Sequence, residues 1–220
     1  NKTELGYLGQ YFPDIALQAR FDAMRREAGQ PTLTDLDSAE RFSMATHTRG
    51  DNASALIYAA TLGDFLSIDR QEIEIVAVTG NSMGWYSALA CSGALSAENG
   101  FRVANSMGTL MQKSLIGGQL VYPFMGSDWQ PDTDTRSALL ALVEDIATRP
   151  EHKLYLSISL GGMLVLAGNE VGLAAFEAAV QPLEGRFPMR LGNHSAFHTP
   201  MLAVIAEEGQ GLLPASLFRQ

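Results

Sequence analysis

Residues 80–84 form a G-x-S-x-G pattern with Ser82 at its centre. The pattern is frequent by chance in chains rich in Gly and Ser, so its context decides its meaning. Here it lies between a β-branched run at 73–78, which predicts a buried strand, and a helix of small residues expected over 83–94. The two glycines then let strand and helix approach closely, and the N–H of Met83 points at the oxyanion formed when a serine attacks a carbonyl. This context favours Ser82 as a catalytic nucleophile on a strained turn.

A nucleophilic serine needs a general base, and the chain has 4 histidines. His152 lies in a charged stretch that is typical of a solvated surface. His47 lies in a loop ahead of a predicted helix and has no assigned role. His194 and His198 share one short segment near the end of the sequence, and their spacing does not separate them. Because a loop histidine is more often structural than catalytic, both interpretations stay open for each of these two residues.

Hydrophobic periodicity predicts a mostly helical first part and a mixed second part. In the first part, helices are expected over 14–27, 52–65, 83–94 and 97–113, with one strand over 73–78. In the second part, strands are expected over 119–125, 154–160, 163–167 and 187–191, and helices over 136–148 and 171–180. This order of strand, helix, strand, strand, helix, strand is typical of a ferredoxin-like layer. A closing helix is expected over 201–212.

The pattern predicts two subdomains of different kinds. A small ferredoxin-like subdomain over 118–189 is expected as an insertion. Residues 1–117 and 190–220 then form a larger α/β catalytic subdomain that is discontinuous in sequence. The chain begins with Asn1 rather than Met, and together with the ending at Gln220 this suggests a piece of something longer.

Composition excludes several classes of protein. The 220 residues are 46% hydrophobic and 18% charged, a balance typical of globular domains rather than disordered or fibrous chains. The net charge of -9 disfavours nucleic acid and anionic membranes as partners. Cys91 is the single cysteine, which excludes an internal disulfide and indicates a cytoplasmic protein without a metal site. The most apolar stretch, 154–168, is too short and too broken to span a bilayer, and we expect no cofactor.

Four blocks of the sequence resemble malonyl-CoA:acyl-carrier-protein transacylases and the acyltransferase domains of polyketide synthases. Residues 80–89 are similar to the family's nucleophile elbow, usually G-H-S-x-G-E-Y-S-A-L, and 195–201 to its A-F-H loop with S/T-P-x-M. Residues 108–112 resemble its R-G-x-x-M-Q helix, and 162–168 its G-x-x-V-I-A-G strand. The resemblance implies an α/β fold, with an α/β-hydrolase-like parallel-sheet core and an inserted ferredoxin-like subdomain.

The same resemblance implies an activity and its partners. Ser82 is expected to accept the acyl group and His198 to act as the base, a dyad whose histidine is oriented by a backbone carbonyl. The acyl group leaves coenzyme A for Ser82, and the phosphopantetheine thiol of an acyl carrier protein then collects it. Acyl-CoA and an acyl carrier protein are the expected partners. Phe197, in the A-F-H loop, is expected among the substrate-binding residues.

Three positions depart from the family pattern. Met107 stands where the family has the arginine that selects malonyl groups, and a thioether cannot pair with a free carboxylate. Arg102 lies roughly 140° away round the helix and would not face the same pocket. The substitution favours acetyl or a longer apolar acyl group, unless Met107 is core and another cation binds malonyl. Asn81 replaces a histidine, and Trp85 replaces a glutamate, where it either shapes the pocket mouth or carrier-protein surface or merely packs.

Two family segments have no counterpart in the sequence. These are the opening strand with its F-P-G-Q-G-S-Q loop and the C-terminal G-P-G loop. We therefore expect a large subdomain truncated at both ends, in a fragment or a degenerate relative that is weakly active or inactive by itself. Two alternatives to acyl transfer stay open: an acyl hydrolase that clears carrier proteins, and a catalytically dead carrier-protein-binding module.

Overall fold

In the computed structural model, which describes residues 4–126 and 128–218, the chain divides into two units. The first unit combines Asn1–Lys113 with Glu208–Gln220, and the second is Ser114–Glu207. Asn1 and Gln220, on which the expectation of a longer parent rests, lie outside the described residues. Each unit has its own hydrophobic core, so each is described by itself.

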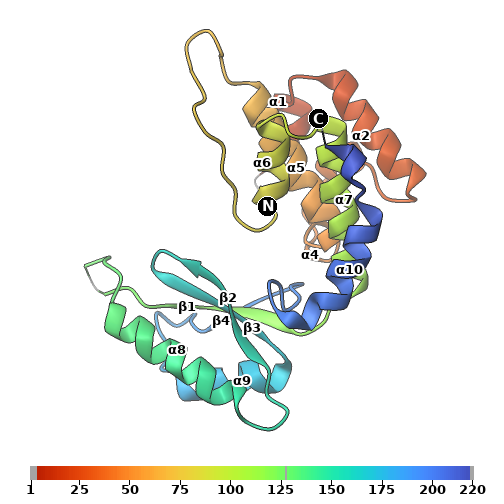
Figure 1. Cartoon of the computed structure of the whole chain (residues 1–220). Helices are drawn as coiled ribbons and strands as arrows, with labels where there is room; N and C mark the ends of the chain where they lie inside the picture. The colour runs from red at the N-terminus through yellow and green to blue at the C-terminus, as the bar shows by residue number, and fades with distance from the viewer. Residues whose placement is uncertain (1–3, 127, 219–220) are drawn as a thin grey trace. The chain divides into compact units, whose positions relative to one another are not determined.

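The named elements of the first unit, within its described part, are all helices, as Figure 1 shows. Its helices are α1 Tyr7–Tyr11, α2 Ile15–Glu27, α3 Leu33–Asp37, α4 Met44–His47, α5 Gly50–Leu66, α6 Gly84–Cys91 and α7 Ala97–Lys113. The later half of α10 (Ala203–Leu212) and the short helix η2 (Ala215–Leu217) belong to it as well. The helices expected over 14–27, 52–65, 83–94 and 97–113 are thereby confirmed, with ends shifted by a few residues.

Helices α5 and α7 form the centre of this unit, and a glycine lets them pack closely. A Cβ atom at Gly108 would lie 2.6 Å from both the Gly50 carbonyl oxygen and the Ser54 hydroxyl oxygen. Nearby, the rings of Phe21 and Phe101 stack with centroids 4.2 Å apart, and both side chains are fully buried. The first residue of the G-x-x-M-Q block is thus a packing residue, which explains why that block needs glycine there.

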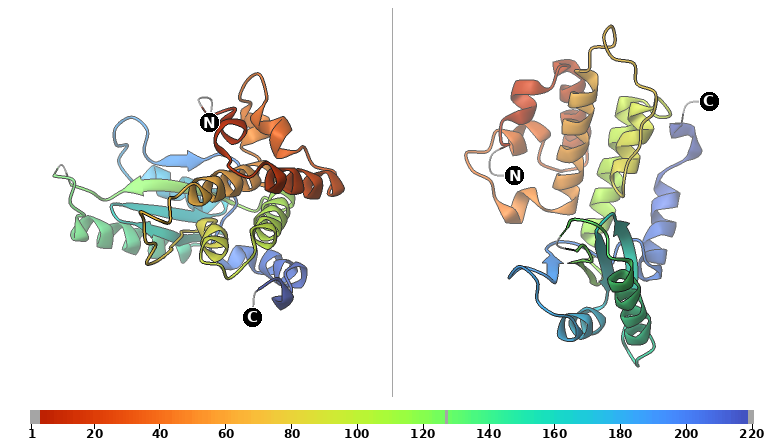
Figure 2. Two further views of the ribbon diagram at one scale, coloured as in Figure 1. Left: turned by 90° about the horizontal axis from the view of Figure 1, so that it is seen from above. Right: turned by 90° about the vertical axis from the view of Figure 1, so that its left-hand side faces the viewer.

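The strand predicted over 73–78 is wrong. Residues 67–83 connect α5 to α6 as an irregular excursion without ladder pairing, visible in Figures 1 and 2. Val76 is 86% exposed and Ile73 is 53% exposed. A strand needs neighbours that take up its backbone hydrogen bonds, and no strand of the described first unit lies beside this segment. The described strands form one antiparallel sheet, in the second unit, so a parallel sheet is not part of the described chain.

That sheet has the arrangement expected for a ferredoxin-like layer. Its elements are β1 Gly118–Pro123, α8 Thr133–Ala147, β2 Leu154–Leu160, β3 Met163–Gly168, α9 Glu170–Ala179 and β4 Met189–Leu191. The strands lie in the order β2-β3-β1-β4, and every neighbouring pair is antiparallel. Helices α8 and α9 cover one face (Figure 1), and Leu120, Leu164, Ile146 and Phe176 are buried between the layers. The predicted order of elements is confirmed.

The second unit extends past the expected range of 118–189 at both ends. The segment after β4 stays attached to it through buried hydrogen bonds. Ala196 N–H donates to the Ile116 carbonyl at 2.8 Å. The Ser195 hydroxyl donates to the Ser114 carbonyl and accepts from Ile116 N–H, each at 3.2 Å. These bonds hold the loop that contains His198 to the residues just before β1, and this loop belongs to the second unit, Ser114–Glu207.

Candidate active site

Ser82 occupies a sharp turn directly before α6. Its φ is 53°, in the left-handed region that residues other than glycine rarely adopt. The turn is closed by backbone hydrogen bonds from Gly84 N–H to the Asn81 carbonyl at 2.8 Å and from Trp85 N–H to the Ser82 carbonyl at 3.0 Å. Strain of this kind persists only where surrounding structure enforces it and is concentrated at functional sites. The structure thus has, at Ser82, the strained turn that the G-x-S-x-G pattern predicts.

Of the two glycines in the pattern, packing requires only the first. A Cβ atom at Gly80 would lie 2.1 Å from the Gly84 carbonyl oxygen, a distance that no side chain can occupy. A Cβ atom at Gly84 would meet nothing within 4 Å. The close approach is therefore made by the chain entering the turn, where Gly80 passes over the first residue of α6.

The backbone N–H of Met83 is available as an oxyanion donor. Met83 is the N-cap residue of α6, and its N–H donates to no acceptor among the described residues. A helix N-terminus also carries a partial positive charge that favours an anion. The arrangement around Ser82 thus places an unsatisfied donor next to the nucleophile, as expected for a site that forms an oxyanion.

A pocket of about 410 Å³ lies beside this turn, entirely within the first unit. Three predicted site residues, Asn81, Ser82 and Met83, line it. Its other walls come from α5, from the segment before the turn and from α6: Ile57, Thr61, Phe65, Val78, Thr79, Gly84, Ser87, Ala88 and Cys91. None of these lining residues carries a formal charge. The pocket therefore suits an apolar group better than one with a carboxylate.

Two further groups in the pocket wall could hydrogen-bond or react. Ser87 is 6% exposed, and its hydroxyl has no hydrogen-bond partner among the described residues. Cys91 is the other potential nucleophile, but burial raises the pKa of its thiol. The reactive thiolate is therefore disfavoured at neutral pH. Ser82 thus has no comparable competitor in the wall of the pocket.

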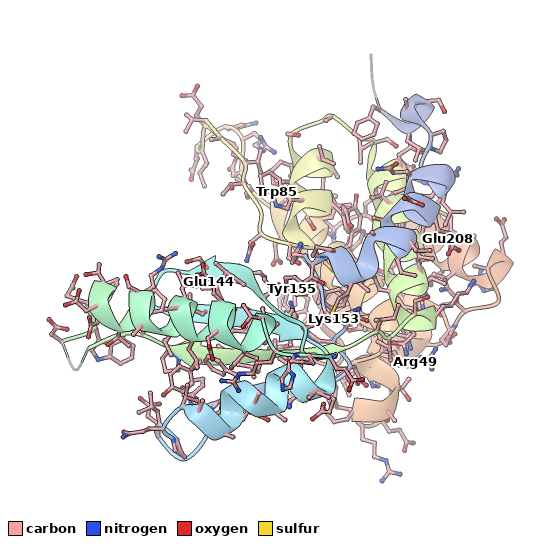
Figure 3. The ribbon with its side chains drawn as sticks, turned by 60° about the horizontal axis from the view of Figure 1, so that its bottom comes forward. Arg49, Trp85, Glu144, Lys153, Tyr155 and Glu208 are labelled. Carbon is pink, nitrogen blue, oxygen red and sulfur yellow. The ribbon has the colours of Figure 1, made fainter. Side chains whose placement is uncertain are left out.

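Met107 and Trp85 lie outside the pocket lining. Met107 is half-buried and packs against the apolar cluster formed by Leu95, Val103 and Leu217. This packing favours the interpretation of Met107 as a core residue of the first unit. Trp85 is 59% exposed at the start of α6 (Figure 3), so it is not a packing residue of the described chain.

His198 lies in the second unit, in the loop that follows β4. Its φ is 59°, so it shares the left-handed backbone conformation of Ser82. The Thr199 hydroxyl donates to the Ala196 carbonyl at 2.7 Å and caps the short helix η1 (Pro200–Leu202) that follows. Ser82 and His198 belong to different units.

The remaining histidines have structural surroundings. His47 is buried, with hydrogen bonds from its ring to the Leu36 carbonyl and to Ser43, so it is a satisfied core histidine of α4 rather than a loop residue. His152 interacts with the Pro150 carbonyl at an exposed turn. His194 contacts Gln119 in the second unit, and burial lowers its pKa. Sequence spacing missed the core position of His47 because the Leu36 partner is far from it in sequence.

Within the described residues, no cluster of three or more His, Cys, Asp or Glu side chains could hold a metal ion. In the same part of the chain, no helix combines the length and apolar character needed to cross a bilayer.

Comparison with the profiles of known protein families finds no match, and neither does comparison with curated protein sequences. Solved structures do match. The malonyl-CoA:ACP transacylase of Synechocystis superposes with a TM-score of 0.73 at 17% identity, over 98% of this chain and 66% of that one. The malonyl-CoA-acyl carrier protein transacylase of Clostridium perfringens gives a TM-score of 0.73 at 18% identity, over 99% of this chain and 65% of that one. The chain spans about two thirds of the length of these proteins.

A third match is a malonyl-transacylase in complex with its type II polyketide-synthase acyl carrier protein. It gives a TM-score of 0.73 at 16% identity, over 100% of this chain and 69% of that one. Acyltransferase domains of polyketide synthases match as well. The chain therefore has the fold of malonyl-CoA:ACP transacylases and polyketide-synthase acyltransferases, which confirms the expected mixed fold with its ferredoxin-like part. The expected parallel sheet is not among the described strands.

Proposed function

We propose that this chain transfers an acyl group from coenzyme A, through an acyl-Ser82 intermediate, to the phosphopantetheine thiol of an acyl carrier protein. The observation that carries the proposal is the backbone of Ser82, held at a φ of 53° between Gly80 and the start of α6. A serine on such an elbow, with a free backbone N–H beside it, is equipped for acyl transfer. The shared fold supports the same reaction class.

The reaction proceeds in two displacements. His198 takes the proton from the Ser82 hydroxyl while the oxygen attacks the thioester carbonyl, and the N–H of Met83 stabilises the resulting oxyanion. The carbon–sulfur bond breaks, and the coenzyme A thiol leaves with the proton from His198. The carrier-protein thiol then gives its proton to His198, attacks the acyl-Ser82 ester and releases the serine hydroxyl.

The acyl group is expected to be apolar, such as an acetyl or short alkyl chain. No charged side chain lines the pocket beside Ser82, so none of the lining residues could pair with a malonyl carboxylate. Asn81 lies in the pocket wall, and its side chain is proposed to contact the acyl group. Phe197 is proposed to contact the substrate from the loop that contains His198.

The carrier protein is proposed to approach the exposed face at the start of α6. Trp85, which is 59% exposed there, fits a contact with the partner rather than with the acyl group. One of the similar structures is a transacylase bound to its acyl carrier protein, which supports this class of partner.

Acyl-enzyme mass spectrometry tests the proposal. The chain is incubated at length with excess acetyl-, hexanoyl- or malonyl-CoA, so that even a slow single turnover leaves an adduct. The expected result is acetyl and hexanoyl adducts on the peptide that contains Ser82, none in Ser82→Ala, and unchanged labelling in Cys91→Ala. Preferential malonyl loading would contradict the specificity, and the absence of any Ser82 adduct would contradict the reaction.

An acyl hydrolase is the second candidate, because the uncharged pocket also suits the removal of apolar acyl groups from carrier proteins. Both reactions use acyl-Ser82 and differ only in the acceptor. Adding pantetheine to isolated acyl-enzyme distinguishes them: transfer to the thiol supports the transferase, and faster release to water supports the hydrolase. A biological role that survives Ser82→Ala would instead identify a docking module.

A further inference from the structure

A chain of hydrogen bonds in the second unit ends at the peptide that precedes His198. The Ser157 hydroxyl oxygen lies 2.9 Å from the Phe197 carbonyl oxygen, and Gln119 Nε2 lies 2.8 Å from the Ser157 hydroxyl. At the other end, His194 Nδ1 lies 2.8 Å from Gln119 Oε1. We call these three side chains the 119–157–194 relay. It starts and ends in the same loop and passes through β1 and β2 on the way.

The carbonyl at its end determines the direction of every bond in the relay. The Phe197 carbonyl can only accept, so the Ser157 hydroxyl must donate its single proton there. Ser157 must then accept from the Gln119 amide nitrogen, which leaves the Gln119 carbonyl oxygen facing His194. His194 must therefore carry a proton on Nδ1. Gln119 is only 3% exposed, so water has little access to the amide at the centre of the relay.

Ser157 reaches the loop because β2 is irregular at this residue. Leu156 and Ile158 pair with consecutive residues of β3, so Ser157 is the extra residue of a β-bulge. Bulges interrupt pairing, redirect a side chain and occur frequently next to active sites. Here the redirected hydroxyl binds the Phe197 carbonyl, 40 residues away in sequence.

The bonded carbonyl controls the backbone at His198. The Phe197 carbonyl and the His198 N–H belong to one planar peptide unit, so holding the oxygen holds the plane from which His198 φ is measured. That φ is 59°, a conformation that a histidine does not keep unless its surroundings enforce it. The relay supplies such an enforcement from outside the loop.

We propose that Ser157, Gln119 and His194 are positioning residues for His198, which they align through the Phe197 carbonyl. The inference rests on the proposed function, in which His198 is the base for Ser82. If the relay only stabilised the fold, its loss would lower the free energy of unfolding without changing the rate of acylation in the folded protein. If the relay positions His198, its loss lowers that rate as well, because a displaced base loses its alignment with the serine hydroxyl.

The kinetic test compares Ser157→Ala with two controls. Ser157→Ala is expected to slow acylation of Ser82 about tenfold to a hundredfold with little change in KM. Ser157→Thr, which keeps the hydroxyl, should restore most of the rate. Ser159→Ala removes an exposed serine of the same strand and should leave the rate unchanged. Equal rates for Ser157→Ala and wild type would overturn the proposal.

A second variant removes the amide donor of Gln119. Gln119→Glu keeps the size of the side chain and can still accept from His194, but its carboxylate cannot donate to Ser157. The acylation rate should therefore fall as in Ser157→Ala, although the residue is nearly isosteric. A rate equal to wild type would show that the direction of bonds is not what aligns the loop.

Nuclear magnetic resonance separates this inference from the proposed function. The imidazole ¹⁵N signals of neutral His194 should show the Nδ1–H tautomer, and Ser157→Ala should shift the backbone amide signal of His198. Both readouts need no catalysis, so they stand if wild type fails to acylate Ser82 and the proposed function fails. An Nε2–H tautomer, or an unshifted His198 amide, would refute the relay.

Discussion

The turn at Ser82 and the loop at His198 contain the same unusual feature, but different parts of the chain enforce it. Each has a non-glycine residue in the left-handed region, with φ of 53° and 59°. At Ser82 the conformation is held by neighbours in sequence, through Gly80 and the first turn of α6. At His198 it is held by side chains from distant strands, through Ser157 and Gln119. Local enforcement leaves a readable sequence pattern, whereas long-range enforcement does not.

Gly80→Ala is expected to have the largest effect, because it disrupts the local contacts that hold the turn at Ser82. The new Cβ would lie 2.1 Å from the Gly84 carbonyl oxygen, so the turn must open. We expect the free energy of unfolding to fall by about 3 kcal/mol. We also expect acylation of Ser82 to be lost, because the serine is displaced. Urea denaturation and acyl-enzyme mass spectrometry measure the two effects.

Gly84→Ala is the matched control for that substitution. Its Cβ would meet nothing within 4 Å, and alanine at the start of a helix lowers the entropy of the unfolded chain. Stability should be unchanged or higher by a few tenths of a kcal/mol. A loss as large as that of Gly80→Ala would show that the close approach is not what distinguishes the two glycines.

Ser195→Ala tests the long-range contacts that hold the loop containing His198. Ser195 is fully buried, and its hydroxyl joins the His198 loop to the backbone of Ser114 and Ile116. Removing it takes away the partner of a partly buried N–H and carbonyl, which costs about 1 kcal/mol of unfolding free energy. Chemical denaturation with Ser159→Ala as the exposed control measures this, and an equal stability of the two variants would contradict the anchoring role.

A small pH dependence is expected at His194, whose ring is partly desolvated although the residue as a whole is exposed. Burial lowers the folded-state pKa below the ordinary value of 6.5, so the neutral form is favoured in the folded protein. Stability from this group is therefore complete above pH 6.5 and falls as pH drops below it, because the unfolded chain then binds the proton more readily. Denaturation midpoints between pH 7.5 and roughly 5 should fall more steeply in wild type than in His194→Asn, which cannot titrate. Parallel pH profiles would contradict this expectation.

Ser87→Ala should have the smallest effect, and in the opposite direction. The Ser87 hydroxyl is buried without a partner among the described residues, so its removal relieves a desolvation cost. We expect the unfolding free energy to rise by up to about 1 kcal/mol, with Ser92→Ala, on the exposed end of α6, near zero. A clear destabilisation would show that the hydroxyl is bonded in solution.

The success of the sequence-based predictions follows the same division. The elbow at Ser82, the helices of the first unit and the order of elements in the second could be predicted, because period, capping and turn residues act over a few positions. The irregular structure of residues 73–78 could not be predicted. Their β-branched residues indicate a strand, but a strand forms only where neighbouring strands are present. His47 was misjudged for a related reason, because its bond to the Leu36 carbonyl depends on how α3 and α4 pack.

The sequence by itself determined the turn at Ser82 and the ferredoxin-like order of elements, since each depends on residue type and short-range geometry. The tertiary structure alone decided which glycine the turn requires, that Met107 packs in an apolar cluster, and that His194 is bonded through Gln119 and Ser157 to the peptide before His198. These features depend on bringing together residues that lie tens of positions apart. Only the folded backbone specifies those distances.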